Sequence, residues 1–352
     1  MFYEKEIAAN IRKAMDIAGD PSRLRPHVKT HKTREIVAMK MSLGISKFKC
    51  ATIAEAEMVA QAGAKDVMLA YPVIGPNIER FVMLIRNYPS TTFEATVDNE
   101  AVAEKLADAA LARSSRAEVL IDIDPGLHRT GVSIGEAATN LYKKICSLRG
   151  LLPGGIHCYD GHNHQSDPAE RNRAGTDCYN EVMAFRAQLV EAKLPVPRVV
   201  MGGTPTFSVY ASFPEVELSP GTCFLQDWSY LTKFPDLAFS PAALLLTRVI
   251  SVNDNFSTFT LDLGYKAISA DPQGVRGVIL NIDDSEALFQ NEEHWVFRKT
   301  KGALPGVGDE AYVLPTHICP TTALHFGAHV VGDDRLSHRI WEITARNRKI
   351  SI

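Results

Sequence analysis

Lys29 lies between two histidines in the segment Arg25 to Lys32, which reads RPHVKTHK. The segment alternates as a β-strand does and follows a turn that contains proline. Burying an unpaired ammonium group costs several kcal/mol, so a lysine in a buried strand is paired, neutralised or used covalently. Lys29 is therefore a candidate nucleophile, with a solvated position beside Lys32 as the alternative. His27 and His31 share its alternation and are expected to flank it on one face of the strand.

His317 and Cys319 form a second chemically capable pair. Residues two apart in an extended segment point to the same face, and an imidazole with a thiolate suits Zn²⁺. Two ligands alone make a weak metal motif, and a buried cysteine beside a hydrogen-bonded histidine is the structural alternative. The six cysteines lack the spacing of a disulfide framework, which indicates reduced thiols.

The elements that must position these residues alternate between strand and helix. The predicted strands are residues 24–31, 47–52, 66–71, 92–97, 118–124, 155–160, 198–203 and 216–222. The predicted helices are residues 5–18, 34–43, 53–62, 78–88, 99–112, 135–148 and 169–192. Eight short apolar strands alternating with helices over roughly 200 to 250 residues are typical of a (β/α)8 barrel, with a seven-strand open sheet as the alternative.

The pattern changes after about residue 229. Short strands are predicted, with turns rich in Gly, Pro and Asn between them and almost no helix, at residues 242–252, 258–263, 277–282, 294–297, 310–313 and 328–331. The sequence therefore predicts an α/β barrel domain over residues 1–229 and a β domain over residues 230–352 that carries His317 and Cys319.

Composition excludes several classes of protein. The chain has 352 residues, of which 45% are hydrophobic and 22% charged, as in soluble globular proteins. The net charge of -3 argues against a nucleic-acid partner. No apolar run reaches the roughly 18 residues of a membrane span, and the first residues do not read as a signal peptide. We expect a cytoplasmic protein with neither a nucleic acid nor a membrane as partner.

Barrels place their functional residues at the carboxyl ends of the strands and in the loops that follow. Gly202-Gly203-Thr204 follows the seventh predicted strand, and Ser219-Pro220-Gly221-Thr222 ends the eighth. These two ends commonly bind phosphate through backbone N–H groups. Because the first and eighth strands are neighbours in a closed barrel, Lys29 and this phosphate site suggest a phosphate-bearing aldehyde held as a Schiff base. Pyridoxal phosphate fits that description.

Seven segments resemble, in order, the fold type III pyridoxal enzymes of the D-threonine aldolase and D-serine dehydratase group. They are LRPHVKTHKT (24–33), KCATIAEAE (49–57), GLHRTG (126–131), HCYDGH (157–162), GGTPTF (202–207), SPGT (219–222) and THICP (316–320). The resemblance runs nearly end to end. It implies an alanine-racemase-like (β/α)8 barrel with a C-terminal β domain, and a homodimer.

Position by position, the resemblance implies that Lys29 is the Schiff-base lysine. Arg129 matches the residue that faces the phenolic oxygen of the cofactor, and Tyr159 the one near the pyridine nitrogen. The phosphate cradle matches Gly203, Thr204, Gly221 and Thr222. A tyrosine near the ring nitrogen does not hold a pyridinium, which weakens the ring as an electron sink.

The resemblance also implies a divalent metal (Zn²⁺, or Mn²⁺ or Co²⁺) at His317 and Cys319, completed by water and substrate. Such a metal is a Lewis acid for a substrate oxygen, which points to a D-amino acid with a β-hydroxyl group. Departure of that hydroxyl gives a 2-oxo acid and ammonia, whereas its deprotonation breaks the Cα–Cβ bond to give glycine and an aldehyde. His162 and His164 are candidates for moving the proton, with loop histidines as the alternative.

Two features of the sequence point to different reactions. A cysteine at position 319 resembles the dehydratases, whereas the sequence of residues 315–325 resembles D-threonine aldolases. We interpret the chain as a lyase for D-β-hydroxy-α-amino acids that uses pyridoxal phosphate and a metal, with retro-aldol cleavage as its reaction. A dehydratase of D-serine or 3-hydroxyaspartate is the alternative. An amino acid racemase, a noncatalytic pyridoxal phosphate carrier and a metal hydrolase are further alternatives.

The first residues depart from the resemblance. Relatives open with a longer extended segment that pairs in the β domain, and Met1-Phe2-Tyr3 matches only its stump. This predicts a frayed or alternatively filled edge in the β domain, and lower stability.

Overall fold

The computed structural model describes residues 1–333 and 335–352. The chain forms two compact units. The β unit consists of Met1–Ile11, Thr30–Thr33 and Thr222–Arg346, and the barrel unit of Arg12–Lys29, Arg34–Gly221 and Asn347–Ile352. The division of the sequence at residues 229 and 230 stays a prediction. Within residues 1–333 and 335–352, no helix has the length and apolarity needed to cross a membrane.

A parallel sheet of seven strands, in the order β2-β3-β4-β5-β6-β7-β8, forms the centre of the barrel unit. Its strands are β2 (Lys47–Cys50), β3 (Asp66–Leu69), β4 (Thr92–Val97), β5 (Ala117–Ile123), β6 (Leu151–Cys158), β7 (Val199–Met201) and β8 (Val216–Leu218). Leu24 forms a bridge with Leu218 of β8, and His27 one with Lys49 of β2. Residues 24–27 thus take the eighth position between the two edge strands, and the predicted (β/α)8 barrel is confirmed.

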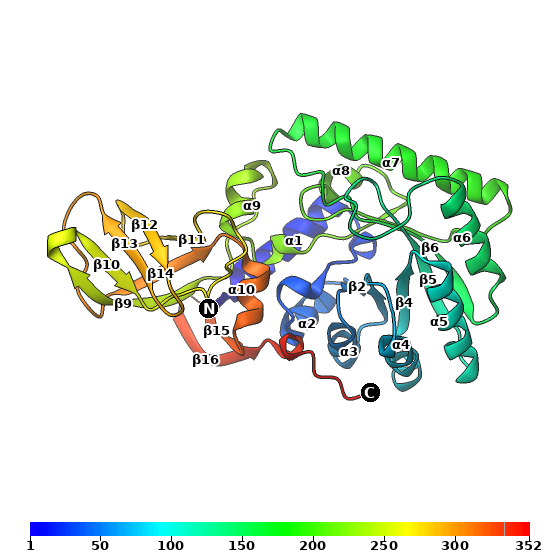
Figure 1. Ribbon diagram of the computed structural model, residues 1–352, viewed down its shortest axis with the longest axis horizontal. Helices are drawn as coiled ribbons and strands as arrows, with labels where there is room; N and C mark the ends of the chain where they lie inside the picture. The colour runs from blue at the N-terminus through cyan, green and yellow to red at the C-terminus, as the bar shows by residue number, and fades with distance from the viewer. Residues whose placement is uncertain (334) are drawn as a thin grey trace. The chain divides into compact units, whose positions relative to one another are not determined.

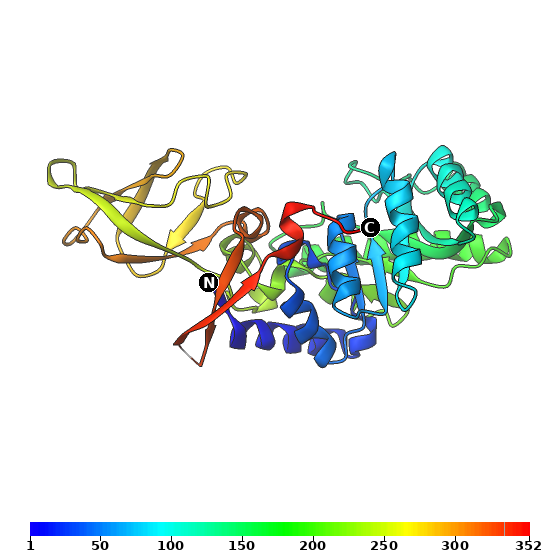
Figure 2. The same ribbon diagram turned by 90° about the horizontal axis from the view of Figure 1, so that it is seen from below.

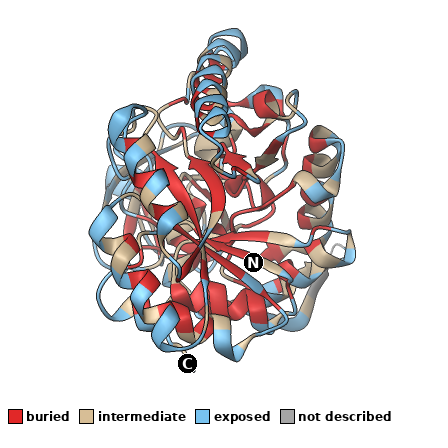
Figure 3. Cartoon of the chain, turned by 90° about the vertical axis from the view of Figure 1, so that its right-hand side faces the viewer, coloured by how far each residue is buried: buried red, intermediate tan, exposed pale blue. Residues whose placement is uncertain are grey.

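The helices of the barrel unit follow the predicted order. They are α1 (Glu4–Ala18), which begins in the β unit, α2 (Arg34–Ser42), α3 (Ile53–Gln61), α4 (Pro76–Asn87), α5 (Glu100–Ala112), α6 (Glu136–Ser147), α7 (Pro168–Glu191) and α8 (Phe207–Tyr210). Helices α3, α4 and α5 run along the outside of the strands (Figure 1). In Figure 3 the strands are buried in the middle of the ring of helices, whose outward faces are exposed. Apolar helical faces therefore cover the sheet, as their periodicity predicts.

The predicted strand at residues 24–31 is wrong in its second half. Val28–Thr30 form the 3₁₀ helix η2 instead, so Lys29 projects from a helical turn. Histidine rings bind the local backbone here, because Nδ1 of His27 accepts the N–H of Lys29 at 3.2 Å and Nδ1 of His31 accepts that of Thr33 at 3.1 Å. Such local bonds compete with a strand ladder. The prediction that His27 and His31 flank Lys29 on one face of a strand is therefore wrong, because these residues do not form a strand.

The interior of the barrel begins with a layer of charges. The buried side chain of Arg25 contacts three carboxylates, at 2.5 Å from Asp66, 2.7 Å from Glu217 and 3.2 Å from Glu94. The apolar side chains of Met68 on β3, Leu120 on β5 and Val200 on β7 also pack together inside the barrel. Lys49, Asp122 and His157 follow in the next polar layer, toward the carboxyl ends of the strands. Layers of this kind fill (β/α)8 barrels.

Arg25→Met is expected to lower the free energy of unfolding by about 3 kcal/mol, because it removes the buried cation that Asp66, Glu94 and Glu217 share. Arg198 still pairs with Glu94 in this variant, and Lys47 with Glu217. Urea unfolding followed by circular dichroism measures the loss. The matched control is Arg113→Met, whose exposed partner Glu79 lies 3.1 Å away. An exposed ion pair contributes at most about 1 kcal/mol, so equal losses in the two variants would contradict the structural role of Arg25.

Two sheets make up the β unit. A six-stranded sheet has the order β11-β14-β9-β10-β13-β12, and a three-stranded sheet the order β1-β15-β16. The strands are β1 (Phe2–Tyr3), β9 (Leu245–Asn253), β10 (Thr258–Leu261), β11 (Gly277–Ile279), β12 (Ser285–Gln290), β13 (Trp295–Lys299), β14 (Glu310–Pro315), β15 (Gly327–Gly332) and β16 (Arg335–Glu342). Figure 2 shows β15 and β16 side by side in orange and red. The prediction had missed β12 and β16.

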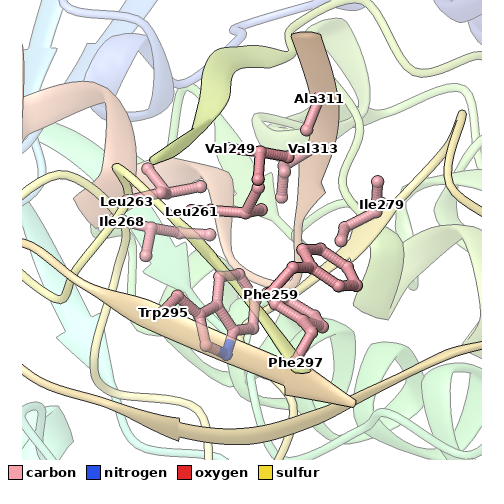
Figure 4. Close-up of a cluster of buried hydrophobic side chains, with 10 residues drawn as sticks. All are labelled: Val249, Phe259, Leu261, Leu263, Ile268, Ile279, Trp295, Phe297, Ala311 and Val313. Atoms are coloured by element: carbon pink, nitrogen blue, oxygen red, sulfur yellow. The ribbon is translucent and has the colours of Figure 1, made fainter. Parts of the chain in front are cut away.

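The core of the β unit is apolar. Trp295 and Phe297 of β13 pack against Phe259 of β10, together with aliphatic side chains of β9, β11 and β14 (Figure 4). The unit also holds two short helices that the sequence did not predict, α9 (Trp228–Lys233) and α10 (Ile318–Leu324). The alternating strands were thus predicted more successfully than the connections between them.

Phe2 and Tyr3 pair on both sides. Strand β1 runs parallel to β15, with Phe2 opposite Val330 and Tyr3 opposite Val331. On its other side the N–H of Tyr3 donates to the carbonyl of Ala242 at 2.9 Å. The short strand is therefore paired rather than frayed, and its effect on stability stays a prediction.

Candidate active site

The ring of Tyr159, directly after β6, is surrounded by cationic groups in the barrel unit. The Nζ atoms of Lys29 and Lys49 lie 5.8 and 5.7 Å from the ring centroid, and the guanidinium carbon of Arg129 lies 5.0 Å from it. These residues come from η2, β2 and the loop after β5. Three cations around one half-buried aromatic ring favour an anionic ligand.

Two glycines fix the position of the Tyr159 ring. A Cβ atom at Gly161 would lie 2.5 Å from the ring, and one at Gly203 would lie 2.9 Å from it. The loops after β6 and β7 therefore approach the ring closely only because both positions lack a side chain. This explains why glycine stands at Gly203, where the sequence predicted part of a phosphate cradle.

The predicted cradle combines backbone donors with hydroxyl groups. The N–H of Gly221 donates to Oγ1 of Thr204 at 3.1 Å, and the N–H of Gly203 lies 3.4 Å from Oγ1 of Thr206. Oγ of Ser219, which follows β8, is buried and has no hydrogen-bond partner among the described residues. A buried hydroxyl without a partner is costly, and a phosphate oxygen would satisfy it. The amine of Lys29, the guanidinium of Arg129 and these donors fit pyridoxal phosphate.

His317 and Cys319 lie at the start of a helix, which corrects the extended segment on which their pairing was predicted. His317 precedes α10 with extended backbone, and Cys319 lies in its first turn. Their side chains nevertheless share a hydrogen bond. The change from extended backbone at His317 to helix at Cys319 therefore brings the imidazole and the thiol together. The sequence had predicted the same proximity from a fully extended segment.

Asp271 is a residue of this second site that the sequence did not single out. Its Oδ2 lies 2.5 Å from Nδ1 of His317, and its other oxygen accepts a hydrogen bond from Ser269. A carboxylate on Nδ1 fixes the tautomer and the ring orientation of a metal-binding histidine and leaves Nε2 for the metal. Asp271 lies in the loop between β10 and β11, 46 residues before His317, so no sequence spacing signals their contact.

The Sγ atom of Cys319 lies among hydroxyl groups of the β unit. It is 3.2 Å from Oγ1 of Thr30 and 3.7 Å from Oγ1 of Thr222. In the sequence, Thr30 directly follows Lys29, and Thr222 directly follows Gly221. Thr222, predicted as part of the phosphate cradle, thus has its hydroxyl near the thiol.

The described part of the chain contains no group of three or more His, Cys, Asp or Glu side chains arranged to hold a metal ion. A metal at His317 and Cys319, which stays a prediction, would have these two as its protein ligands, with water or substrate as the others. The donor set itself, one imidazole and one thiol with a carboxylate behind the imidazole, fits Zn²⁺.

Two sequence families match the chain. Residues 4–225 match the family described as alanine racemase, N-terminal domain, and residues 242–331 match a serine dehydratase domain. The chain belongs to the alanine racemase N-terminal domain family. The predicted resemblance to fold type III pyridoxal enzymes is thereby confirmed.

Similar proteins of this family cover nearly the whole chain. A D-threonine aldolase from Arthrobacter sp is 28% identical over 330 residues, 92% of this chain and 85% of the aldolase. A D-threo-3-hydroxyaspartate dehydratase from Delftia sp. (strain HT23) is 27% identical over 356 residues, 90% of this chain and 88% of the dehydratase. The crystal structure of a D-threonine aldolase from Filomicrobium marinum has a TM-score of 0.90 at 26% identity, and covers 99% of this chain and 94% of that one.

The two candidate proton carriers of this family member differ in their surroundings. The half-buried ring of His162 lies against the loop after β5, 3.5 Å from where a Cβ of Gly126 would be. Its buried Nδ1 lacks a partner within residues 1–333 and 335–352. His164 is exposed, with Nδ1 3.4 Å from the carbonyl oxygen of Gly161. His162 is therefore the better placed of the two, and both assignments stay predictions.

Asp160 ties the loops of the barrel mouth together. Its carboxylate accepts hydrogen bonds from Tyr210 at 2.6 Å, Thr206 at 2.9 Å and Asn163 at 3.3 Å. Burial raises the pKa of Asp160, while these donors act in the opposite direction. The sequence placed Asp160 at a strand end but gave no reason to expect this network, which fixes Tyr159 and the Gly203 loop relative to each other.

Gly203→Ala is expected to weaken binding of pyridoxal phosphate roughly 10-fold to 100-fold, because the new methyl group displaces the Tyr159 ring. Titration of the protein with cofactor, followed by absorbance, measures the change. In a Tyr159→Ala background the same substitution meets no ring and should cost little. A full loss in that background would show that the strain lies elsewhere.

Proposed function

We propose that the chain is a lyase for D-β-hydroxy-α-amino acids that uses pyridoxal phosphate and a divalent metal, and that it cleaves the Cα–Cβ bond to give glycine and an aldehyde. The observation that carries the proposal is the convergence of Lys29 and Arg129 on the Tyr159 ring, at 5.8 and 5.0 Å from its centroid. The similar D-threonine aldolases support the reaction.

The residues of the barrel unit divide the work of binding the cofactor. Pyridoxal phosphate, when bound, supplies an aldehyde for covalent attachment and a ring that withdraws electrons from the breaking bond. Lys29 Nζ would hold the aldehyde carbon, and Arg129 would bind the phenolic oxygen. Backbone N–H groups of Gly203 and Gly221, with the hydroxyl of Ser219, would hold the phosphate. Tyr159 would lie near the ring nitrogen without supplying a proton to it.

The residues of the β unit hold the metal in this proposal. His317 Nε2 and Cys319 Sγ are its protein ligands, and Asp271 fixes the orientation of the His317 ring. A divalent cation at this position polarises the β-hydroxyl of the substrate. Of the candidate metals, Zn²⁺ suits a thiolate ligand best, and Mn²⁺ and Co²⁺ are the alternatives.

The proton of the β-hydroxyl needs an acceptor. We assign it to Nδ1 of His162, a buried nitrogen with no partner among the described side chains. When this nitrogen takes the hydroxyl proton, the electron pair of the Cα–Cβ bond can leave the β-carbon, which becomes the carbonyl carbon of the aldehyde. The Cα atom then takes up a proton and glycine is released.

A dehydratase that forms a 2-oxo acid and ammonia is the second candidate. Cys319 favours it, because the resemblance associates a cysteine at this position with dehydratases, and the Delftia protein of similar sequence is a dehydratase. In this case the hydroxyl group would leave as hydroxide, which a metal held by His317 and Cys319 would stabilise, and the Cα–Cβ bond would stay intact.

Product analysis separates the candidates. The purified protein, supplied with pyridoxal phosphate and Zn²⁺, Mn²⁺ or Co²⁺, is incubated with D-threonine, D-serine and D-threo-3-hydroxyaspartate, and with the L-enantiomers as controls. We expect glycine and an aldehyde from the D-substrates. A 2-oxo acid with ammonia would establish the dehydratase, interconversion of enantiomers a racemase, and the absence of any product would refute a lyase. The homodimer and the cytoplasmic location stay predictions.

A further inference from the structure

Lys49, His157 and Asp122 form a buried chain of hydrogen bonds that the proposed reaction does not use. Lys49 Nζ lies 3.1 Å from Nε2 of His157, and Nδ1 of His157 lies 2.6 Å from Oδ1 of Asp122. The residues come from the neighbouring strands β5 and β6 and from β2, and their exposed fractions are 3%, 4% and 6%. Three ionisable side chains thus meet inside the barrel, away from water.

The arrangement fixes which atoms exchange a proton. Oδ1 of Asp122 accepts the Nδ1 proton of His157, and Oδ2 of Asp122 is held by the hydroxyl of Thr130 at 3.1 Å. Nε2 of His157 therefore faces Lys49 Nζ, and one proton can sit on either nitrogen. With this proton, the three side chains together carry one positive charge and the negative charge of Asp122. Without the proton, they carry only the negative charge of Asp122.

The surrounding charges place this exchange near neutral pH. Burial first, and then repulsion from Lys29 and Arg25, lower the pKa of Lys49 to about 7 against the attraction of Asp122 and Asp160. Burial and then repulsion from Lys49 and Arg129 lower the pKa of His157, against the attraction of Asp122. The pKa of Lys49 thus depends on Asp122, which lies in the same set of buried side chains, and on Lys29, which lies beside the Tyr159 ring.

The chain lies next to the candidate cofactor site. Lys49 Nζ is 5.7 Å from the Tyr159 ring centroid, about as far as Lys29 Nζ is. A cavity of about 20 Å³ has Asp122, His157, Arg129 and Tyr159 among its lining residues. That volume accommodates one water molecule, which would link the buried chain to the mouth of the barrel.

We propose that Asp122, His157 and Lys49 hold one exchangeable proton beneath Tyr159 and thereby set the charge around the cofactor. With the proton, three cationic groups surround the Tyr159 ring. After its loss two remain, and the site binds an anionic cofactor less tightly. The three residues act through Tyr159 and Arg129, so they are positioning residues rather than catalytic ones. The effect on the cofactor rests on the proposed function, whereas the proton exchange itself does not.

The proton exchange is tested without cofactor. Protein with ¹³C-labelled histidine is titrated by NMR, and the His157 signal is assigned by its loss in His157→Gln. Lys49→Met should raise the midpoint of the His157 titration by about one pH unit or more, because a neighbouring cation is removed. Asp122→Asn should lower it. Lys47→Met is the matched control, since Lys47 lies two residues earlier on β2 and pairs instead with Glu217 at 2.6 Å. It should leave the midpoint unchanged.

The effect on the cofactor is tested with pyridoxal phosphate bound and no substrate. The visible absorbance of the wild-type protein is expected to change with a midpoint near pH 7, and the dissociation constant of the cofactor to rise about 10-fold above it. Lys49→Arg should abolish this midpoint and keep the spectrum of the acid side, because arginine stays charged. Lys49→Met should move the midpoint to that of the His157 titration measured by NMR. Circular dichroism confirms that each variant is folded.

The outcomes separate the two claims. An unchanged His157 midpoint in both Lys49→Met and Asp122→Asn would overturn the proton-holding chain. An absorbance midpoint that stays at its wild-type pH in both Lys49→Met and Lys49→Arg would overturn its influence on the site. A wild-type protein that binds no pyridoxal phosphate would refute the proposed function, while the NMR titration would still decide the exchange.

Discussion

Lys29→Ala is expected to lower the lyase activity by roughly 10³-fold or more and to remove the visible absorbance of bound pyridoxal phosphate. The side chain projects from the 3₁₀ turn η2, and its amine lies 5.8 Å from the ring centroid of Tyr159. Loss of a covalent group removes the attachment itself, and neighbouring residues restore little of it. Steady-state kinetics and an absorbance spectrum of the same sample measure both effects.

Two further lysine variants sharpen this test. Lys32→Ala removes a charge three residues away and should keep both the activity and the absorbance. Lys29→Arg keeps the positive charge but not a nucleophilic amine, so it should fail as Lys29→Ala does. Full activity in Lys29→Arg would mean that Lys29 contributes charge alone, and the assignment of a covalent role would be wrong.

Removal of the metal is expected to lower the activity by roughly 10²-fold or more while leaving the cofactor absorbance in place. The cofactor should stay bound because different residues bind the two groups. His317, Cys319 and Asp271, which are assigned to the metal, lie in the β unit, whereas Lys29 and Tyr159 lie in the barrel unit. Treatment with a chelator, followed by addition of single metals, measures the loss and its recovery.

Exchange of the thiol ligand gives the metal assignment its control. Cys319→Ala should reproduce the effect of the chelator. Cys319→Asp should restore part of the activity and shift the preferred metal from Zn²⁺ toward Mn²⁺, since a carboxylate suits harder cations than a thiolate does. Activity that neither the chelator nor Cys319→Ala diminishes would show that the reaction needs no metal at this site.

The barrel could be predicted from the sequence because its strands are short apolar runs and its helices have one apolar face. Both signals are local, because each depends on the spacing of apolar residues along a short stretch of sequence. The prediction failed at residues 28–31, where the rings of His27 and His31 bind nearby backbone N–H groups. Such side-chain bonds to the backbone leave no trace in hydrophobic alternation.

The candidate site was predictable only in part. Lys29, Arg129, Tyr159 and Gly203 were predicted because motifs of a known family mark them, and the structure brings them together around the Tyr159 ring. Asp271 and the hydrogen-bonded set of Lys49, His157 and Asp122 were missed as partners, because the tertiary fold brings together residues that are far apart in the sequence. Their only signal was the presence of polar residues at or near strand ends, which does not say which of them meet.

The most direct test of the central claim is to locate the covalent attachment of the cofactor. The protein is incubated with pyridoxal phosphate, reduced with borohydride so that a C=N bond becomes a stable C–N bond, digested, and analysed by mass spectrometry. We expect a phosphopyridoxyl group on Lys29. A protein without this group, or with it on Lys49 or another lysine instead, would contradict the covalent role of Lys29.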